Sequence, residues 1–218
     1  MSAKPLAPIE VPWTMKPVES GETRFEKLSD GRMKFSIRHD IIRGVTPAML
    51  VWWLNNMDGA IRIGDQDIPR YRAWHPRDHY ALTYVRPGKD GRRFSAGAKV
   101  RIQEFFGANP KYKIDVVEEI DFLDETGFRH KKLVIGREVA VIEYKFTAVS
   151  DGTLYENAMI VGGDGNTLFG KFVNVAVRPR VFPEQMGRAW LKHNIEEVGN
   201  LQFFLPALYA SAHRDQAA

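Results

Sequence analysis

The sequence contains no cysteine, and this absence excludes several kinds of site at once. Without thiols the chain cannot form a disulfide framework, a thiolate zinc site, an iron–sulfur cluster or a cysteine nucleophile. Any transition metal must therefore be held by histidine, aspartate or glutamate. The 218 residues are 44% hydrophobic, which is enough to bury a sizeable core without covalent links.

Long apolar runs and long basic runs are also missing. The longest apolar run, residues 49–54, is far too short to span a bilayer. The proline-rich residues 1–17 lack the apolar core of a secretory signal, so we expect a cytoplasmic protein without a membrane partner. The net charge of +4 comes from scattered bases, and no basic run is long enough to suggest a nucleic-acid partner.

The composition and periodicity of the sequence change once, near residue 30. Residues 1–30 carry four prolines and little periodicity, which predicts an extended arm. We find no repeat or low-complexity linker after it, so residues 31–218 are expected to form a single domain.

The pattern of apolar residues predicts a mixed α+β fold. A strand is expected at residues 33–42 and a largely buried helix at 48–57, begun by Thr46 and Pro47. Turn signals then divide residues 61–161 into about six antiparallel strands. A long helix is predicted at 184–204, stopped by Pro206. Because an antiparallel sheet with one apolar face needs a covering helix, we expect a curved sheet wrapped around the C-terminal helix, with a cavity between them.

Two polar side chains lie on the apolar side of that last helix. His193 and Glu197 are one turn apart, on the stripe that also carries Met186, Trp190 and Leu201. A carboxylate on an apolar stripe is costly unless it is paired or bound to a metal. The simpler alternative is a His–Glu hydrogen bond near the helix surface.

The strands offer further candidates for the same cavity. Alternation places Glu104 on an apolar face, with Val100, Ile102 and Phe106. His79 shares a strand face with Ala81 and Thr83. His75 has the same parity, but four strand residues span roughly 13 Å, so one metal cannot take both histidines unless Pro76 bends the chain. We therefore prefer His79 and keep His75 as an alternative ligand or a residue that supports the ligands.

Two imidazoles and two carboxylates, without a thiolate, are typical of a Zn²⁺ site, with Mn²⁺ or Fe²⁺ as alternatives. An open coordination position would let such a metal activate water.

Other polar residues are weaker candidates. Glu118 competes with Glu104, but its neighbours Glu119 and Asp121 favour a solvated strand. Three histidines have charged or small neighbours and are expected at the surface: His39, His130 and His213. Tyr71 and Tyr155 could hydrogen-bond the oxygens of a substrate, although strand tyrosines usually serve packing.

Three strings of residues, at 71–79, 101–110 and 187–200, together resemble the diacetylphloroglucinol hydrolase family, which includes the phloretin hydrolases. The most specific string is His-Asn-Ile-Glu-Glu-Val-Gly-Asn from His193, and the likeness covers about residues 49–209. The resemblance implies a Bet v 1-like helix-grip fold and a zinc ion held by two histidines and two glutamates. It also implies hydrolysis of the carbon–carbon bond between an acyl group and a phenolic ring.

The resemblance also implies site residues. The helix ligands fall on His193 and Glu197 and the strand carboxylate on Glu104. A family tyrosine eight residues before the first histidine ligand matches Tyr71 with His79. A second substrate-binding tyrosine corresponds to Tyr155. An asparagine of the family falls on Leu82, which cannot donate a hydrogen bond.

We therefore expect a zinc-dependent hydrolase of carbon–carbon bonds in ketonic substances, acting on an acylated phenol or a similar β-diketone. Glu104 is the candidate proton shuttle. Aromatic residues are expected to pack against the phenolic ring of the substrate. Trp190 is the first candidate, and Trp52 and Trp53 are candidates if they face inward. The alternative is a non-catalytic helix-grip carrier of an apolar or phenolic molecule. A homodimer is left open.

Overall fold

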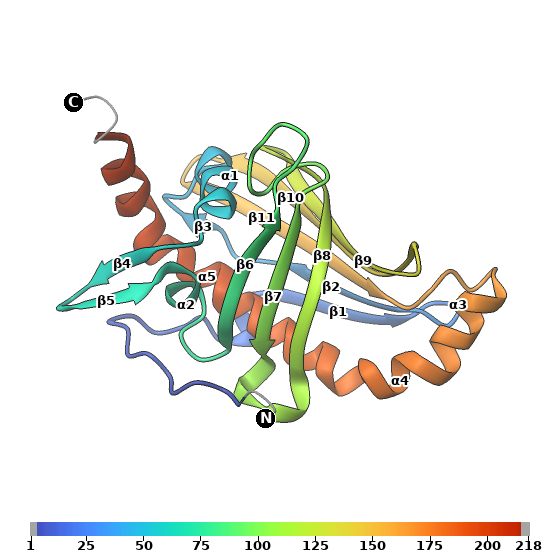
Figure 1. Ribbon diagram of the computed structural model, residues 1–218. Coiled ribbons are helices and arrows are strands. Elements are labelled where there is room, and N and C mark those ends of the chain that lie inside the picture. Colours follow the sequence, from blue (N-terminus) through green and yellow to red (C-terminus); the bar gives the residue numbers. More distant parts are fainter. Residues whose placement is uncertain (1–3, 215–218) are drawn as a thin grey trace.

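The computed structural model describes residues 4–214, and a curved antiparallel sheet forms most of it (Figure 1). Within these residues nine strands share the sheet, in the order β1-β2-β11-β10-β9-β8-β7-β6, with β3 pairing with β11. The strands are β1 (Glu22–Lys27), β2 (Met33–Arg38), β3 (Ile42–Arg43), β6 (His79–Arg86), β7 (Lys99–Phe105), β8 (Lys113–Asp124), β9 (Gly127–Val134), β10 (Arg137–Val149) and β11 (Gly152–Val161). A separate hairpin consists of β4 (Ala60–Ile63) and β5 (Gln66–Pro69).

The helices lie before, between and after the strands. The α-helices are α1 (Pro47–Asn55), α2 (Arg70–Trp74), α3 (Leu168–Phe172), α4 (Arg178–Val181) and α5 (Glu184–Arg214). A π-helical turn, η4 (Val173–Val177), joins α3 to α4, and three 3₁₀ turns are η1 (Val18–Ser20), η2 (Phe106–Ala108) and η3 (Pro110–Tyr112). Thr46 caps α1 as expected, because its hydroxyl accepts a hydrogen bond from the backbone N–H of Met49.

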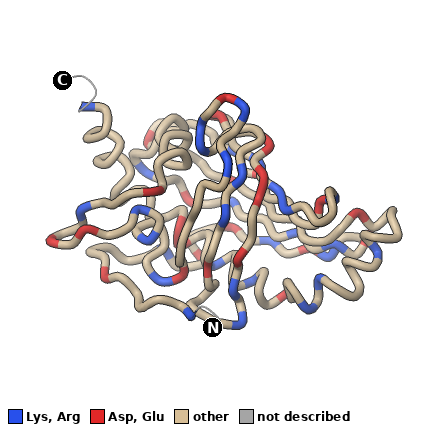
Figure 2. Tube along the Cα trace, viewed as in Figure 1, with Lys and Arg blue, Asp and Glu red and all other residues tan. Residues whose placement is uncertain are grey.

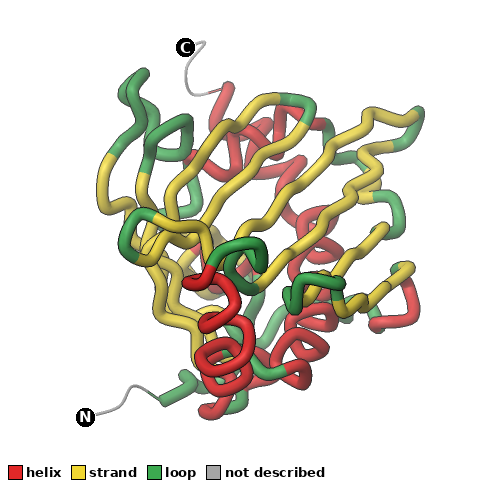
Figure 3. Tube along the Cα trace, turned by 90° about the vertical axis from the view of Figure 1, so that its right-hand side faces the viewer, coloured by secondary structure: helices red, strands yellow, loops and turns green. Residues whose placement is uncertain are grey.

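The long helix α5 runs across one side of the sheet (Figures 1 and 3). Its first half packs into one apolar cluster, where Met186, Trp190 and Ile195 meet Phe35 and neighbouring strand residues. Its second half packs into another, which contains α1 and α2 side chains together with Val198, Leu201 and Leu205. The sheet and α5 therefore enclose two apolar clusters, one beside the first half of α5 and one beside its second half. The predicted α+β fold class, with a curved antiparallel sheet wrapped around a long C-terminal helix, is confirmed.

Pro206 does not stop α5, contrary to the prediction. The helix continues to Arg214, although proline removes one internal hydrogen bond. Leu205 is fully buried, and the Tyr209 ring packs edge-on against Trp52 of α1 at 5.5 Å. Tertiary packing on both sides of the proline thus outweighs its local cost.

Two other features differ from the expectation. Part of the expected arm is a strand, because β1 pairs with β2 along its whole length and Phe25 stacks on Phe35. The short helical segments α2 and α3–α4 were not predicted.

Charges are spread over the whole chain. Figure 2 shows lysine and arginine interspersed with aspartate and glutamate along the trace, without a long basic segment. In the part of the chain that is described, no helix combines the length and the apolar character needed to cross a membrane.

Candidate metal centre

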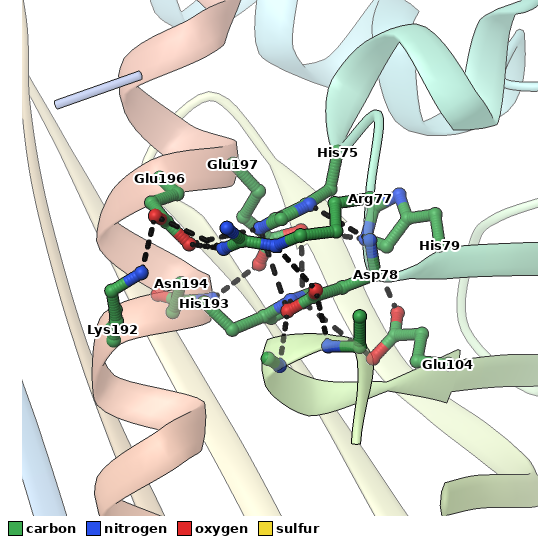
Figure 4. Close-up of polar contacts among 12 residues, drawn as sticks. His75, Arg77, Asp78, His79, Glu104, Lys192, His193, Asn194, Glu196 and Glu197 are labelled. Atoms are coloured by element: carbon green, nitrogen blue, oxygen red, sulfur yellow. Dashed lines mark hydrogen bonds and ion pairs between the residues drawn. The ribbon is translucent and has the colours of Figure 1, made fainter. Parts of the chain in front are cut away.

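The four predicted ligands come from three elements and meet at one place (Figure 4). His79 begins β6 and lies directly opposite Glu104 of β7 in the strand register. His193 and Glu197 are one turn apart on α5, and all four side chains are buried. Strand pairing therefore brings one histidine and one carboxylate together, and helix periodicity brings the other pair.

The distances among these side chains are short. His79 Nε2 lies 3.4 Å from Glu104 Oε1 and 3.2 Å from Glu197 Oε2. His193 Nε2 lies 3.6 Å from Glu104 Oε2 and 3.8 Å from Glu197 Oε2. Ligand atoms of His79, His193 and Glu197 all lie within 4.8 Å of one another, which is close enough to share one ion.

A β-bulge explains how His79 reaches this position. His79 pairs with Glu104 but Ala81 pairs with Gln103, so Tyr80 is an extra residue in β6. The bulge turns Ala81 to the outer face while His79 stays on the inner one. The strand parity expected from the sequence placed these two residues on one face, and the bulge shows that this expectation was wrong.

Hydrogen bonds orient both imidazoles so that their Nε2 atoms face the carboxylates. His79 Nδ1 lies 2.7 Å from the Tyr71 carbonyl, to which it donates. His193 Nδ1 donates to Asp78 Oδ2 at 3.1 Å. His79, whose pKa is lowered, is neutral, so its Nε2 carries a lone pair, and this buried atom has no hydrogen-bond partner among the described residues. A lone pair of this kind, in a buried cluster of carboxylates, fits a metal ligand.

The carboxylates are held in the same way. Glu104 accepts a hydrogen bond from the Tyr71 hydroxyl, and Glu197 accepts one from the Asn194 amide. Asn157 of β11 in turn donates to Asn194. Supporting hydrogen bonds of this type fix the direction of metal-ligating side chains.

Asp78 is a supporting residue that the sequence analysis missed. Besides His193, its carboxylate accepts from the backbone N–H groups of Gly107 and Ala108, at 2.7 and 2.9 Å. These bonds, above all the one from His193, hold the pKa of Asp78 well below its usual range, although burial opposes the ionised form. Asp78 therefore remains a carboxylate that ties η2 to α5.

The structure separates the roles of the two candidate histidines. His75 Nδ1 accepts from the Asp78 N–H at 3.1 Å, and its Nε2 lies 3.2 Å from Glu196 Oε2. With His193, His75 and Asp78 also form a group close enough for an ion. Both ring nitrogens of His75 are already engaged, however, and its ring stacks on His193 at 4.6 Å. His75 thus has both ring nitrogens engaged and packs on His193, whereas the Nε2 of His79 is free to hold an ion.

Titration properties fit a site for a dication. Burial lowers the pKa of His79 to about 4. Burial also disfavours the charged form of His193, but nearby Glu197 and Asp78 outweigh it and raise the pKa to about 9. Burial raises the pKa of Glu197 above its ordinary value. The raised pKa of His193 reports the negative charge of the carboxylates around it, which a divalent cation would also balance.

The cluster opens onto an apolar cavity of about 630 Å³. Tyr71, Trp190, Glu104, His193 and Glu197 all line it. Tyr155 does not; it is buried beside His39, Phe146 and Tyr144, and Tyr144 lines the cavity instead. Trp52 and Trp53 also lie outside the lining: Trp53 packs in the core, and Trp52 packs against Tyr209.

Several surface assignments from the sequence were wrong. Glu118 and His130 are buried and line the cavity. His39 is also buried, 4% exposed, and burial lowers its pKa to about 3. Glu118 shares a strand face with Ile114 and Ile120, and this pattern indicated burial. Its charged neighbours lie on the opposite face and gave a misleading indication of exposure.

Comparisons with known proteins are limited to distant likenesses in shape. No family model and no curated protein matches the chain. Ara h 8.0201 is 12% identical, with a TM-score of 0.44 over 78% of this chain and 98% of that one. A protein from Rhodobacter sphaeroides is 14% identical, with a TM-score of 0.46 over 86% and 99%. The KanY protein is 10% identical, with a TM-score of 0.46 over 88% and 99%. Likenesses this distant carry no argument about function.

Proposed function

We propose that this protein is a zinc-dependent hydrolase that cleaves the carbon–carbon bond between an acyl group and a phenolic ring, or a similar β-diketone. The observation that supports the proposal best is the buried convergence of two imidazole Nε2 atoms and two carboxylates at the wall of an apolar cavity. The sequence resemblance to the diacetylphloroglucinol hydrolases supports the same activity.

The residues that would hold the ion are His79, Glu104, His193 and Glu197. When bound, zinc supplies Lewis acidity, which polarises a carbonyl group and activates water at neutral pH. Two histidines and two carboxylates, without a thiol, suit zinc, with Mn²⁺ or Fe²⁺ as alternatives.

The chemistry needs a proton carrier as well as a metal. A hydroxyl group next to the acyl group lets the phenol tautomerise to a ketone, so the bond to be broken becomes that of a 1,3-diketone. Hydrolysis then adds the hydroxyl of water to the acyl carbon and a proton to the ring carbon. Glu104 is our candidate for carrying this proton; it lines the cavity, as Glu197 and Glu118 do, and it accepts a hydrogen bond from the Tyr71 hydroxyl.

Two further residues have roles in this proposal. Burial and the charge of Glu104 raise the pKa of Tyr71 well above its usual value, so its hydroxyl stays protonated and donates to Glu104. Trp190 lines the cavity, where it would pack against the phenolic ring of the substrate and keep bulk water out.

The test combines metal analysis with product detection. We expect stoichiometric zinc in the purified protein and release of a carboxylic acid from an acylphenol. His193→Ala should abolish both, whereas Glu104→Gln should lose turnover by at least about 100-fold, the usual range for a proton-transfer group. His213→Ala, which changes an exposed histidine of the same helix, is the matched control.

The second candidate function is a non-catalytic carrier, favoured by the cavity volume of about 630 Å³ in a helix-grip fold. A protein that binds phenols without stoichiometric zinc, and releases no acid, would support the carrier and contradict the hydrolase.

A further inference from the structure

A second polar cluster faces the same cavity, away from the metal centre. It consists of Glu118 on β8, His130 on β9 and Tyr144 on β10, all lining the cavity. His130 lies opposite Ile120, two residues from Glu118, and also opposite Ile142, two residues from Tyr144. The three side chains therefore share one face of three adjacent strands.

The cluster is linked internally and still presents a carboxylate to the cavity. Glu118 Oε2 forms an ion pair with His130 Nδ1 at 2.5 Å, and His130 Nε2 contacts the Tyr144 hydroxyl at 3.3 Å. Glu118 lines the apolar cavity and is buried. Burying a carboxylate in apolar surroundings is costly, and a hydrogen-bond donor from a ligand would lower that cost.

The aromatic neighbours hold the cluster in place. The Tyr144 ring stacks on Phe128 at 3.8 Å, and the His130 ring is parallel to the same phenylalanine at 5.6 Å. Phe94 packs edge-on against Phe128. The polar atoms are therefore presented from rigid side chains next to surfaces that suit a flat ring.

The separation from the metal centre follows from the strand register. Glu104 lies opposite Ile114 of β8, and Glu118 is four residues further along the same strand. Four strand residues span about 13 Å. One elongated ligand can thus contact both ends of the cavity.

We propose that Glu118, His130 and Tyr144 form a subsite that binds a neutral hydroxyl group on the ring of the ligand. A carboxylate only accepts hydrogen bonds, so Glu118 requires a donor and repels an anion. The same hydroxyl oxygen can accept a hydrogen bond from His130 or Tyr144. Naming the ligand a phenol rests on the proposed function, but the preference for a neutral hydroxyl does not.

The test compares 2-naphthol with naphthalene, which has the same ring system but no hydroxyl. In the zinc-loaded wild-type protein we expect 2-naphthol to bind at least about 10-fold more tightly, the usual gain from a hydrogen bond to a charged group. Glu118→Gln should remove most of this preference, and Tyr144→Phe should reduce it. Both substitutions are nearly isosteric, and naphthalene affinity should stay unchanged in each.

Glu119→Gln is the matched control, because Glu119 is adjacent on β8 and faces outward, 3.6 Å from Lys99. Equal binding of the two probes to the wild type, or equal losses in Glu118→Gln and Glu119→Gln, would overturn the subsite. So would a preference that disappears when a chelator removes zinc, because the hydroxyl would then bind at the metal centre. Selective naphthol binding in a protein that cleaves no acylphenol would contradict the proposed function and leave the subsite intact.

Discussion

Single residues of the metal centre were predictable by type, but the hydrogen bonds that orient them were not. The placement of His193, Glu197 and Glu104 on apolar faces follows from periodicity alone. The role of Asp78 does not, because its bond to His193 joins residues 115 positions apart in the chain. Glu118 and His130 were misjudged for a related reason: charged neighbours in sequence say little about the face on which a strand residue lies.

The orienting role of Asp78 gives the first prediction. Asp78→Asn keeps the shape of the side chain but removes the charge that fixes the His193 tautomer. We expect zinc affinity to fall by about 10–100-fold, the usual effect of losing such a partner. Competition with a chromophoric chelator measures this loss. Asp151→Asn, at an exposed carboxylate paired with Arg43, should leave the affinity unchanged; equal effects of the two variants would remove this role from Asp78.

A second prediction concerns His39, whose pKa is lowered by burial to about 3. The unfolded chain binds a proton at this histidine near pH 6.5, whereas the folded protein does not, so stability falls as the pH drops from about 6.5 toward 3. Between pH 6.5 and 5 the loss should be on the order of 1–2 kcal/mol. Urea unfolding of the wild type and of His39→Gln measures it, and a variant with the same pH dependence as the wild type would contradict this origin.

At the scale of elements, strands and helices were easier to predict than their ends. Turn signals gave the β8–β9 and β10–β11 hairpins but not the β9–β10 turn, and the apolar stripe gave α5. The sequence predicts that α5 ends at Pro206, yet Leu205 and Tyr209 pack the helix on either side of the proline. Local propensity marks where a helix is weak, and tertiary contacts decide whether it ends there.

The crossing of α5 over β2 is tight, which gives a third prediction. A Cβ atom at Gly187 would overlap the buried ring of Phe35. We expect Gly187→Ala to destabilise the protein by about 1–3 kcal/mol through overpacking, although alanine favours helices. Gly199→Ala is the matched control in the same helix, because its Cβ would meet only the flexible side chain of Lys16. Denaturation midpoints of the two variants should differ, and equal values would exclude overpacking at Gly187.

At the scale of the whole molecule, the sequence predicted the cavity better than its lining. A sheet with one apolar face and a long helix to cover it implied an enclosed space, and that space exists. The sequence could not predict which tyrosine lines the cavity. Tyr144 and Tyr155 lie on neighbouring strands with ring centroids 5.7 Å apart, and Tyr155 lies opposite Phe146, two residues along β10 from Tyr144, so they share a face and differ in position along the strands.

The fourth prediction concerns overall stability. Because the metal centre joins β6, β7 and α5, an ion bound there favours the folded state. Zinc at 100 times its dissociation constant should add about 2.7 kcal/mol, and the Tm should rise by roughly 5–10 °C for a chain of this size. A chelator should reverse the rise. Thermal unfolding of His193→Ala, with and without zinc, is the control, and an equal rise in that variant would place the ion elsewhere.

The bulge at Tyr80 separates the sequence spacing of His79 from the face on which this histidine lies. Deleting Tyr80 would restore regular alternation and make His79 adjacent to Ala81, so the histidine would still lie opposite Glu104 on the inner face. A relative that lacks the extra residue could therefore keep all four candidate ligands. In sequences of this kind, a one-residue gap beside the histidine would not indicate the loss of a ligand.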